Sequence, residues 1–347
     1  MRIIKFLLIS IVFSGCERLF IEPNPENTPE NNFEMFWNSF EEHYALFEIK
    51  KIDWHSIYNT YRPQVNSSTT DRQLYTALVN MIYELKDGHA DIYPDFDAPS
   101  SLYDKSLGYP ENSPENAIHY IENVEKTWSD EKGEYIFQYG NIKNTELGYI
   151  RIYTFEGNVN PLDLYSNKDF ERIDEILAEF KNKKGLVIDI RSNGGGSDFL
   201  SKIVAARFTD KKVLWGYITW RNGKNYSDVL TKERYFEHRG EYFDKPVAVL
   251  INRNTYSAGE GFASMMDVLP QAKLFGGNTG GGSGGGAYFE LPNGWSYRVT
   301  TNYGGDANGF CYENAGIAPD YDVTITDADI ANKKDRILEE AVKYLNN

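Results

Sequence analysis

The sequence is poor in the residues that hold metals and build disulfide frameworks. Only two cysteines, Cys16 and Cys311, and five histidines occur among 347 residues. Their spacing matches no metal-ligand motif, so we predict no metal and no cofactor. With so few cysteines, the fold cannot depend on a network of disulfides.

Clustered positive charge is also missing. Lysine and arginine total 36 against 51 acidic residues, which gives a formal net charge of −15. Nucleic-acid sites need a concentrated basic surface, and no such cluster occurs, so nucleic acid is excluded as a partner. The glycine-rich stretch 276–283 lacks the Gly-Lys-Ser/Thr ending of a phosphate-binding loop, which argues against nucleotide binding.

The sequence has no hydrophobic run of the roughly 20 residues that a membrane-spanning helix needs. The apolar stretch 6–13 follows a basic start and has the length of a secretory signal. The next residues, Ser14-Gly15-Cys16, resemble a bacterial lipobox. That resemblance implies a lipoprotein signal peptide over residues 1–15 and a lipid on the Cys16 thiol. It therefore implies a lipid-anchored protein of the bacterial cell envelope. Such a protein would lie in the periplasm, at the outer membrane or at the cell surface. The alternative is an ordinary signal peptide with a leftover cysteine.

Composition and periodicity divide the rest of the chain into four segments. Residues 16–32 are rich in Pro, Asn and Glu and predict a flexible tether. Residues 33–93 predict an N-terminal helical domain, because apolar residues recur at three- and four-residue spacing. Residues 94–145 predict an irregular connecting segment with one strand near 135–139. Residues 146–347 alternate strands with helices, which predicts an α/β domain.

Apolar runs and capping signals locate the elements of the α/β domain. The expected strands span residues 147–155, 185–191, 213–220 and 246–252, and the expected helices span 167–181, 198–208, 257–268 and 331–345. Residues 286–291 and 295–301, joined across Pro292-Asn293-Gly294, predict a β-hairpin with an Asn-Gly turn.

The most informative segment is Thr255-Tyr256-Ser257-Ala258-Gly259, between an apolar strand and a helix. A serine at such a junction lies at the positive end of a helix dipole, beside backbone N–H groups without intrahelical partners. That position can expose a nucleophile and stabilise the oxyanion that it creates. The alternative is that Ser257 serves only as a helix N-cap, where serine is common.

A second segment, residues 189–196, runs from an apolar strand through a polar turn into three consecutive glycines. Glycine lets backbone N–H groups approach a ligand closely, as an oxyanion site requires. A plain strand-to-helix loop explains the same pattern. Asp189 and Arg191 could simply pair with each other or cap nearby turns.

A serine nucleophile usually needs a base with a near-neutral pKa, and histidine is the common choice. Among the histidines, His89 directly follows the end of a predicted helix, where a side chain can project from a rigid element. A carboxylate best orients the imidazole, and Glu313 lies in a mixed apolar setting within residues 310–320. The alternatives are a structural histidine and a glutamate of a surface turn.

Four segments together resemble the tail-specific, or carboxy-terminal-processing, serine peptidase superfamily, in its branch with a tricorn-type core. They are residues 85–89, 189–196, 255–260 and 313–320. The resemblance implies an α/β fold with a crotonase/ClpP-like core of repeated strand–strand–helix units after a helical domain. It also implies that Ser257 is the nucleophile, His89 the base and Glu313 the supporting carboxylate. The backbone N–H groups of Gly195 and Ala258 would form the oxyanion hole.

The sequence departs from this superfamily in three respects. One branch uses a Ser–Lys pair with the lysine in the glycine-rich turn after the nucleophile, but residues 276–283 contain no lysine, so His89 has to be the base. Tricorn-type sites place a serine just before the histidine, where this chain has Gly88, and one hydrogen bond is thereby removed. The stretch 94–145 is also short for the PDZ domain common in these enzymes.

The resulting prediction is a lipid-anchored serine peptidase that cleaves peptide or protein substrates through an acyl-enzyme on Ser257. One alternative is a noncatalytic module that binds an apolar or peptide ligand on the same core, as in retinoid-binding proteins. A second is an acyl-thioester enzyme of the crotonase type that does not use the serine. A separation below about 3.2 Å between His89 and Ser257 would favour the peptidase.

Overall fold

The computed structural model describes residues 25–99, 101, 114–128, 135–158 and 166–347. The predicted signal peptide, Cys16 and the first part of the predicted tether therefore lie outside the described residues. Among the helices of the described ranges, none is both long and apolar enough to cross a membrane.

The centre of the molecule is a seven-stranded sheet. Its strand order is β12 (Tyr321–Asp322), β9 (Ala272–Gly276), β8 (Val247–Ile251), β5 (Gly185–Asp189), β4 (Leu147–Ile152), β3 (Tyr135–Ile142) and β2 (Ile121–Trp128). Neighbours from β12 to β4 pair in parallel, and β3 and β2 pair antiparallel. Parallel strands place their carboxyl ends along one edge, so β5 and β8 deliver the loops that follow them to the same place.

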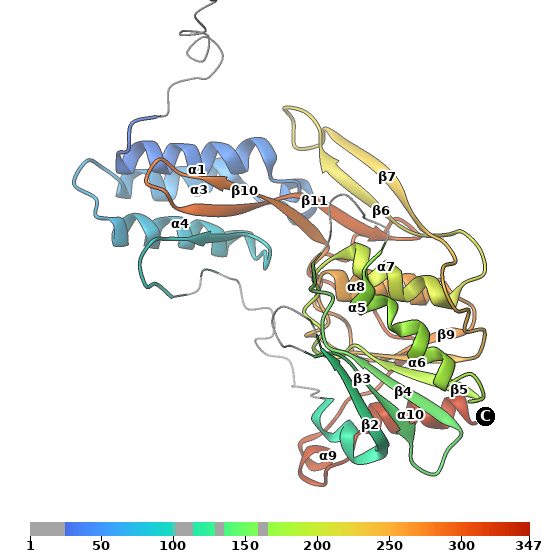
Figure 1. The fold of residues 1–347 in the computed structure, drawn as a ribbon. Helices are drawn as coiled ribbons and strands as arrows, with labels where there is room; N and C mark the ends of the chain where they lie inside the picture. The colour runs from blue at the N-terminus through green and yellow to red at the C-terminus, as the bar shows by residue number, and fades with distance from the viewer. Residues whose placement is uncertain (1–24, 100, 102–113, 129–134, 159–165) are drawn as a thin grey trace, which may run out of the picture.

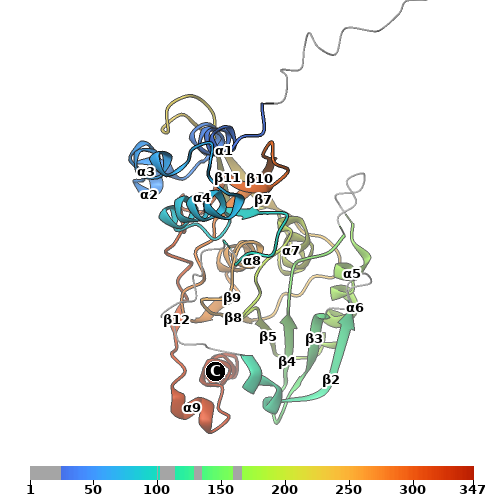
Figure 2. The same ribbon diagram turned by 90° about the vertical axis from the view of Figure 1, so that its left-hand side faces the viewer.

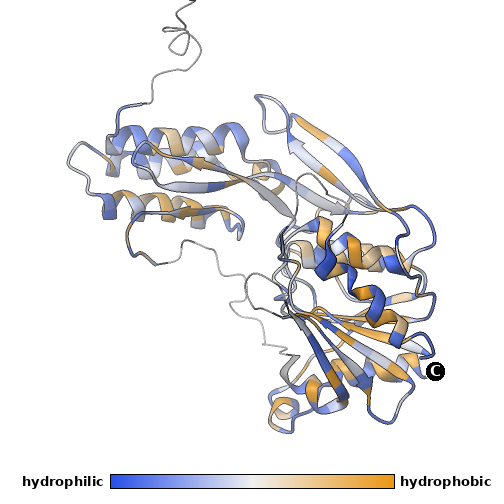
Figure 3. Cartoon of the chain, in the orientation of Figure 1, coloured by the Kyte–Doolittle hydropathy of each residue, from blue (hydrophilic) through white to orange (hydrophobic). Residues whose placement is uncertain are grey.

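Helices cover both faces of this sheet. The structure places α6 (Ile173–Glu179), α7 (Asp198–Ala205) and α8 (Ala258–Asp267) on one face and α10 (Arg336–Leu345) on the other (Figure 1, Figure 2). Because both faces are covered, β5 and β8 are buried along their whole length and their sequences are nearly continuous apolar runs (Figure 3). The predicted α/β fold class is confirmed.

A second sheet connects this core to the N-terminal helices. Strand β11 (Ser296–Asp306) pairs with β1 (Asp91–Tyr93), β6 (Val213–Arg221) and β10 (Gly284–Glu290), and β6 pairs with β7 (Val229–Phe236). Strands β10 and β11 form the predicted hairpin, with Gly294 of its turn at φ +85°. Since β1 follows His89 almost directly, its pairing with β11 anchors the chain just beyond that histidine.

The N-terminal helices pack against the β10–β11 hairpin (Figure 2). They are α1 (Pro29–His43), α2 (Phe47–Lys50), α3 (Trp54–Tyr61) and α4 (Asp71–Leu85), and they share one hydrophobic core with it. In that core the ring centroids of Phe36 and Tyr297 lie 5.2 Å apart. The aromatic periodicity of the sequence is therefore explained by core packing.

Two stretches differ from the sequence-based expectation. Residues 94–145, expected to be an irregular connection with one strand near 135–139, contain that strand as β3 and also contain β2, and both extend the central sheet. Strand β2 lies at the sheet edge and is mostly exposed, so its polar sequence gives little sign of a strand. Helix α1 begins at Pro29, inside the expected tether, because Thr28 Oγ1 accepts from the N–H of Asn31 and caps the helix.

Two helices of the α/β domain follow the prediction closely, and two differ from it. Helices α7 and α8 lie within the predicted ranges 198–208 and 257–268. The predicted helix over 167–181 is divided into α5 (Lys168–Glu171) and α6. The predicted closing helix starts later than expected, because α9 (Asp327–Ala331) ends and Asp335 then caps α10 through the N–H of Leu338.

Candidate active site

Ser257 lies where the chain leaves β8 and enters α8, as the sequence predicts. Its backbone has φ +53° and ψ −120°, a conformation that residues with a side chain rarely adopt. A strained strand-to-helix turn lifts its side chain away from the sheet and exposes the reactive atom. Ser257 also occupies the N-cap position of α8, so the capping and nucleophile interpretations are compatible.

His89 reaches Ser257 from the N-terminal part of the chain. Its Nε2 lies 3.1 Å from Ser257 Oγ, although 168 positions separate the two residues. After α4, Lys86 adopts a left-handed conformation with φ +49° and turns the chain toward β1. Asp87 Oδ1 then accepts from the backbone N–H of His89 at 2.8 Å. The imidazole is buried, whereas Ser257 is half-buried.

Tyr256, to which the sequence analysis assigns no role, also contacts the imidazole. Its hydroxyl lies 3.3 Å from His89 Nδ1. Its ring stacks on the imidazole with 4.8 Å between centroids and 22° between planes. Burial, reinforced by the charges of Asp87 and Glu313, raises the pKa of Tyr256 well above its usual value. The only hint in the sequence is its position next to Ser257.

Glu313, the expected supporting carboxylate, is buried. Its Oε1 forms an ion pair with Lys50 Nζ at 2.9 Å. Its Oε2 accepts from both the backbone N–H and the hydroxyl of Ser283, each at 2.9 Å. The contacts of the expected carboxylate thus include Lys50 and Ser283, and its charge acts on Tyr256.

Lys50 connects the N-terminal helices to this cluster. It is the last residue of α2, and its side chain is 5% exposed. Besides its ion pair with Glu313, its ammonium donates to the carbonyls of Leu85 at 3.2 Å and Lys86 at 2.9 Å, where α4 ends. The helix dipole favours a cation at this end. Lys50 therefore ties Glu313 to the segment that carries His89, a role without any local sequence signal.

Glu260, in the first turn of α8, binds the backbone of Ser257. Its Oε1 accepts from Thr279 Oγ1 at 2.6 Å and from Gly281 N at 2.7 Å. Its Oε2 accepts from Gly282 N at 2.7 Å and from Ser257 N at 3.1 Å. Burial raises the pKa of Glu260 to about 7, although these hydrogen bonds favour the charged form. Glu260 thus joins the nucleophile to the glycine-rich stretch.

The two expected oxyanion donors lie beside Ser257. A Cβ placed on Gly195 would lie 2.8 Å from Ser257 Cβ and 2.9 Å from Ala258 N, so the loop needs glycine there. In this state the N–H of Gly195 donates to Asn193 Oδ1 at 2.9 Å. An oxyanion would therefore have to share this amide with Asn193 or displace it. Ala258 is the first residue of α8, and an amide at that position has no intrahelical acceptor.

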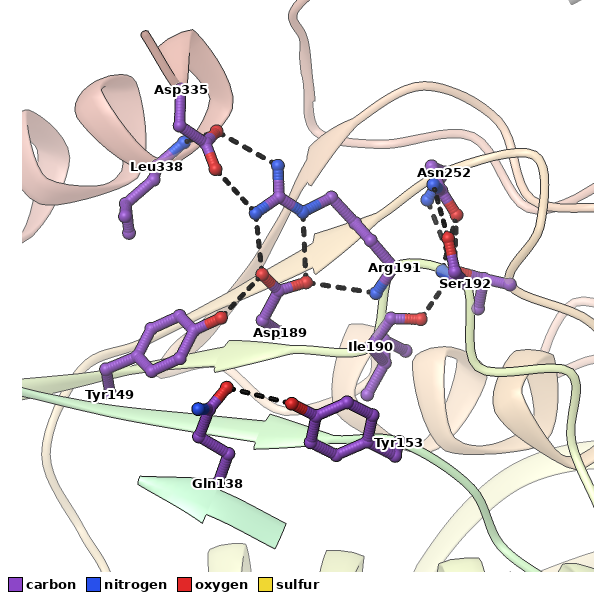
Figure 4. A network of polar contacts seen from close by, with 11 residues as sticks. Gln138, Tyr149, Tyr153, Asp189, Ile190, Arg191, Ser192, Asn252, Asp335 and Leu338 are labelled. Carbon is purple, nitrogen blue, oxygen red and sulfur yellow. Dashed lines mark hydrogen bonds and ion pairs between the residues drawn. The ribbon is translucent and has the colours of Figure 1, made fainter. Parts of the chain in front are cut away.

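The loop that carries Gly195 is anchored by a buried ion network (Figure 4). Arg191 donates to Asp189 at 3.0 and 2.6 Å and to Asp335 at 2.9 and 2.7 Å. Tyr149 donates to Asp189 Oδ2 at 2.9 Å. Burial alone would raise the pKa of Asp189, but the Arg191 guanidinium outweighs burial and holds that pKa below its usual value. The pairing considered as an alternative from the sequence is thus present, and it links the end of β5 to α10.

Hydrogen bonds also join the loops that follow β5 and β8. Ser192 N donates to Asn252 Oδ1 at 2.9 Å (Figure 4). Tyr256 N donates to the carbonyl of Asn193 at 3.0 Å. These bonds hold the glycine turn against the nucleophile loop.

This arrangement suits acyl transfer from a serine. An imidazole within hydrogen-bond reach can deprotonate a hydroxyl, and amides at a helix N-terminus can stabilise an oxyanion. The separation of 3.1 Å between His89 and Ser257 meets the criterion set for a peptidase. Within the described ranges, no group of three or more His, Cys, Asp or Glu side chains could hold a metal ion.

Comparisons with known proteins agree with this chemistry. Residues 146–323 match the model of peptidase family S41. Residues 25–83 match the model of the tricorn protease C1 domain. The solved structure of a peptidase from Parabacteroides merdae is 32% identical, with 92% of this chain and 97% of that chain covered and a TM-score of 0.80.

Two curated proteins are more distant relatives. A carboxy-terminal-processing protease from Bartonella bacilliformis is 26% identical over 51% of this chain and 44% of its own length. The nisin-resistance protein of Lactococcus lactis is 26% identical over 58% of this chain and 64% of its own length. The chain thus spans about half the length of these curated relatives. The family model nevertheless covers half of the chain, and the chain belongs to the serine peptidases of family S41, with a tricorn C1 domain ahead of the S41 region.

Proposed function

We propose that the chain hydrolyses peptide bonds through an acyl-enzyme formed on Ser257. His89 takes the proton of the Ser257 hydroxyl as its oxygen attacks the peptide carbonyl. The N–H groups of Ala258 and Gly195 stabilise the oxyanion, and Glu313 is the supporting carboxylate. The imidazolium gives its proton to the leaving amine. His89 then deprotonates a water molecule, which attacks the ester and releases the acyl group.

The observation that carries this proposal is the 3.1 Å contact between Ser257 Oγ and His89 Nε2. The strained backbone of Ser257, at φ +53°, adds weight, because such strain is typical of reactive positions. A module that only binds ligands on the same core would need neither feature. Both therefore favour an enzyme over the binding alternative.

Labelling with a fluorophosphonate probe tests the nucleophile without a known substrate. We expect the parent chain to be labelled, Ser257→Ala to lose labelling, and His89→Gln to react about 10²–10⁴-fold more slowly. Ser201→Ala is a matched control, because Ser201 is a buried serine of α7 whose hydroxyl donates to the carbonyl of Asp198 at 3.0 Å. Equal labelling of Ser257→Ala and the parent would overturn the assignment.

We propose peptides or proteins as the substrates, cleaved toward their carboxyl ends. The support is the relative from Bartonella bacilliformis, which is a carboxy-terminal-processing protease. Mass spectrometry of a peptide library incubated with the chain would give the cleavage sites. Products that persist with Ser257→Ala would exclude this chain as their source.

We further propose a bacterial lipoprotein, tethered to the cell envelope through a lipid on Cys16. In this proposal residues 1–15 are the signal peptide, residues 33–93 the helical domain and residues 146–347 the peptidase core. The basic start and the short apolar stretch support the signal peptide. Metabolic labelling with a palmitate analogue tests the anchor. The parent chain and Cys311→Ser should be labelled, and Cys16→Ser should not.

A further inference from the structure

We infer that Tyr256 is a positioning residue of this site, whose hydroxyl accepts the Nδ1 proton of His89 and keeps the Nε2 lone pair directed at Ser257. The inference deepens the proposed function and rests on it. Two contacts suggest it, 3.1 Å from Nε2 to Ser257 Oγ and 3.3 Å from Nδ1 to the Tyr256 hydroxyl. Tyr256 and Ser257 are neighbours, so one short segment supplies a partner for each imidazole nitrogen.

The direction of the Tyr256 hydrogen bond follows from the tautomer that the reaction needs. A neutral imidazole carries one proton, on either Nδ1 or Nε2. To accept the serine proton, Nε2 must present its lone pair, so the ring proton must lie on Nδ1. A phenol oxygen at 3.3 Å can accept that proton. If Tyr256 donated to Nδ1 instead, Nε2–H would point at Ser257 and no base would remain.

On the segment that carries His89, Asp87 contacts the backbone of the histidine. Gly88 has no side chain to offer to the imidazole. Asp87 Oδ1 accepts from the backbone N–H of His89 at 2.8 Å, which shapes the turn. The hydroxyl at Nδ1 comes from the nucleophile loop instead, so the same loop places both the attacking group and the group that orients its base.

The ring of Tyr256 is closely held by its neighbours. The imidazole stacks on it, and the glycine-rich stretch packs against it. A Cβ on Gly282 would lie 2.0 Å from Tyr256 Cζ, and a Cβ on Gly280 would lie 2.5 Å from Tyr256 Cδ2. Only a backbone without side chains can approach the ring so closely. A ring confined in this way keeps its hydroxyl at Nδ1 with little loss of entropy during the reaction.

The surrounding charges favour a Tyr256 phenol that stays protonated. The charged groups that act on it are the carboxylates of Asp87, Glu313 and Glu260 and the guanidinium of Arg298. Burial is the largest influence and the carboxylates add to it, so the pKa of Tyr256 is raised, whereas the guanidinium lowers it. The same carboxylates favour the imidazolium that forms when the base takes the serine proton.

Nitrogen NMR of ¹⁵N-histidine-labelled protein tests the tautomer without catalysis. The ring nitrogen shifts report which nitrogen carries the proton, and His89→Gln identifies the signals of His89. We expect Nδ1 protonation in the parent chain and a shift toward the Nε2-protonated form in Tyr256→Phe, which keeps the stacked ring. Tyr139→Phe is the matched control, because it removes a phenol that donates to Glu125 Oε2 at 2.9 Å on another part of the sheet.

Fluorophosphonate labelling tests the consequence for reactivity. We expect Tyr256→Phe to lower the labelling rate of Ser257 by about 10- to 100-fold. Loss of the Nδ1 acceptor makes the imidazolium less stable, so the pH at which labelling falls to half should move to lower values. Tyr139→Phe should keep the parent rate and pH profile. If Tyr256 only filled space, its replacement by phenylalanine would change neither the labelling rate nor the pH profile of labelling.

The two measurements separate this inference from the proposed function. A parent chain that is not labelled, with a tautomer that still responds to Tyr256→Phe, would support the hydrogen bond and reject the peptidase mechanism. An unchanged tautomer in Tyr256→Phe would overturn the inference. The inference would also be overturned if neutral His89 carried its proton on Nε2 in the parent chain. That result needs no variant other than the one used to assign the signals.

Discussion

At the scale of single residues, Glu260 is an ionisable group that binds the backbone of the nucleophile. Its carboxylate accepts the N–H of Ser257 at 3.1 Å and the N–H groups of Gly281 and Gly282 at 2.7 Å. These donors favour the charged form, whereas burial favours the neutral acid. Burial is the larger influence, so the pKa is raised to about 7 and both forms are populated near neutral pH.

A raised carboxyl pKa makes stability depend on pH in a defined direction. Glutamate in an unfolded chain titrates near a pKa of about 4.3, and in the folded chain Glu260 titrates at about 7. Its contribution to the free energy of unfolding is therefore fully present below the unfolded value and is lost as pH rises through 7. We expect Glu260→Gln to remove this part of the pH dependence.

Urea unfolding at about pH 5 and about pH 8 measures the effect. The loss of unfolding free energy between the two pH values should be smaller in Glu260→Gln than in the parent chain. Glu84→Gln, which changes an exposed carboxyl of α4, should keep the parent difference. Equal pH dependence in the parent and Glu260→Gln would contradict the raised pKa.

At the scale of elements, the glycine-rich stretch 276–283 acts through its lack of side chains. Two of its amides donate to Glu260, and its backbone lies against the ring of Tyr256. This use differs from the phosphate-binding role that glycine-rich loops often have. The stretch brings backbone close to the half-buried ring of Tyr256 and the buried carboxylate of Glu260, which no other residue type would allow.

Replacement of one glycine in this stretch should therefore disturb the site. In Gly282→Ala the new Cβ would lie 2.0 Å from Tyr256 Cζ, so the ring or the loop must move. We expect a loss of stability of about 1–3 kcal/mol and slower fluorophosphonate labelling. At Gly277 an added Cβ has no heavy atom of the described chain within 4 Å, so Gly277→Ala should match the parent in both measurements.

Helix α2 has only four residues but contributes a buried cation to the site. The side chains of Lys50 and Glu313 are 5% and 0% exposed, so Lys50→Met leaves a buried carboxylate without this partner. Removal of one member of a buried ion pair costs about 3–5 kcal/mol. Lys51→Met changes an exposed neighbour and should be close to neutral. Thermal unfolding of both variants measures the difference, and an equal effect would argue against a buried pair.

The local elements could largely be predicted from sequence, whereas the contacts between them could not. The Ser257 junction is predictable because an apolar strand and a helix signal meet there. Strand β2 is missed because it is exposed at a sheet edge. Lys50 and Tyr256 are missed because each acts on a partner that only tertiary packing brings near. His89 is predictable as a projecting side chain, but its distance from Ser257 is not.

At the scale of the whole molecule, the buried network around Arg191 connects the middle of the central sheet to its last helix. Arg191 pairs with Asp189 at the end of β5 and with Asp335 at the start of α10, and all three side chains are buried. The strand end that carries the glycine turn is thus held by a residue more than a hundred positions away. The position of the glycine turn therefore depends on packing between β5 and α10, which the sequence motif at residues 189–196 does not specify.

Arg191→Met should therefore destabilise the whole fold. It leaves two carboxylates buried without their shared cation, for which we expect a loss of about 3–5 kcal/mol or more in urea unfolding. Arg336→Met is the control, because the Arg336 side chain is 48% exposed and its ion pair is long at 3.8 Å. A loss in Arg191→Met no larger than that in Arg336→Met would mean that the network adds little to stability.

The separation of base and nucleophile along the chain also has a consequence for biosynthesis. The imidazole emerges from the ribosome 168 positions before the hydroxyl that it must activate. The helices that precede it share a hydrophobic core with the β10–β11 hairpin, which follows the hydroxyl in the sequence. A nascent or truncated chain that lacks the hairpin should therefore not react with a fluorophosphonate probe.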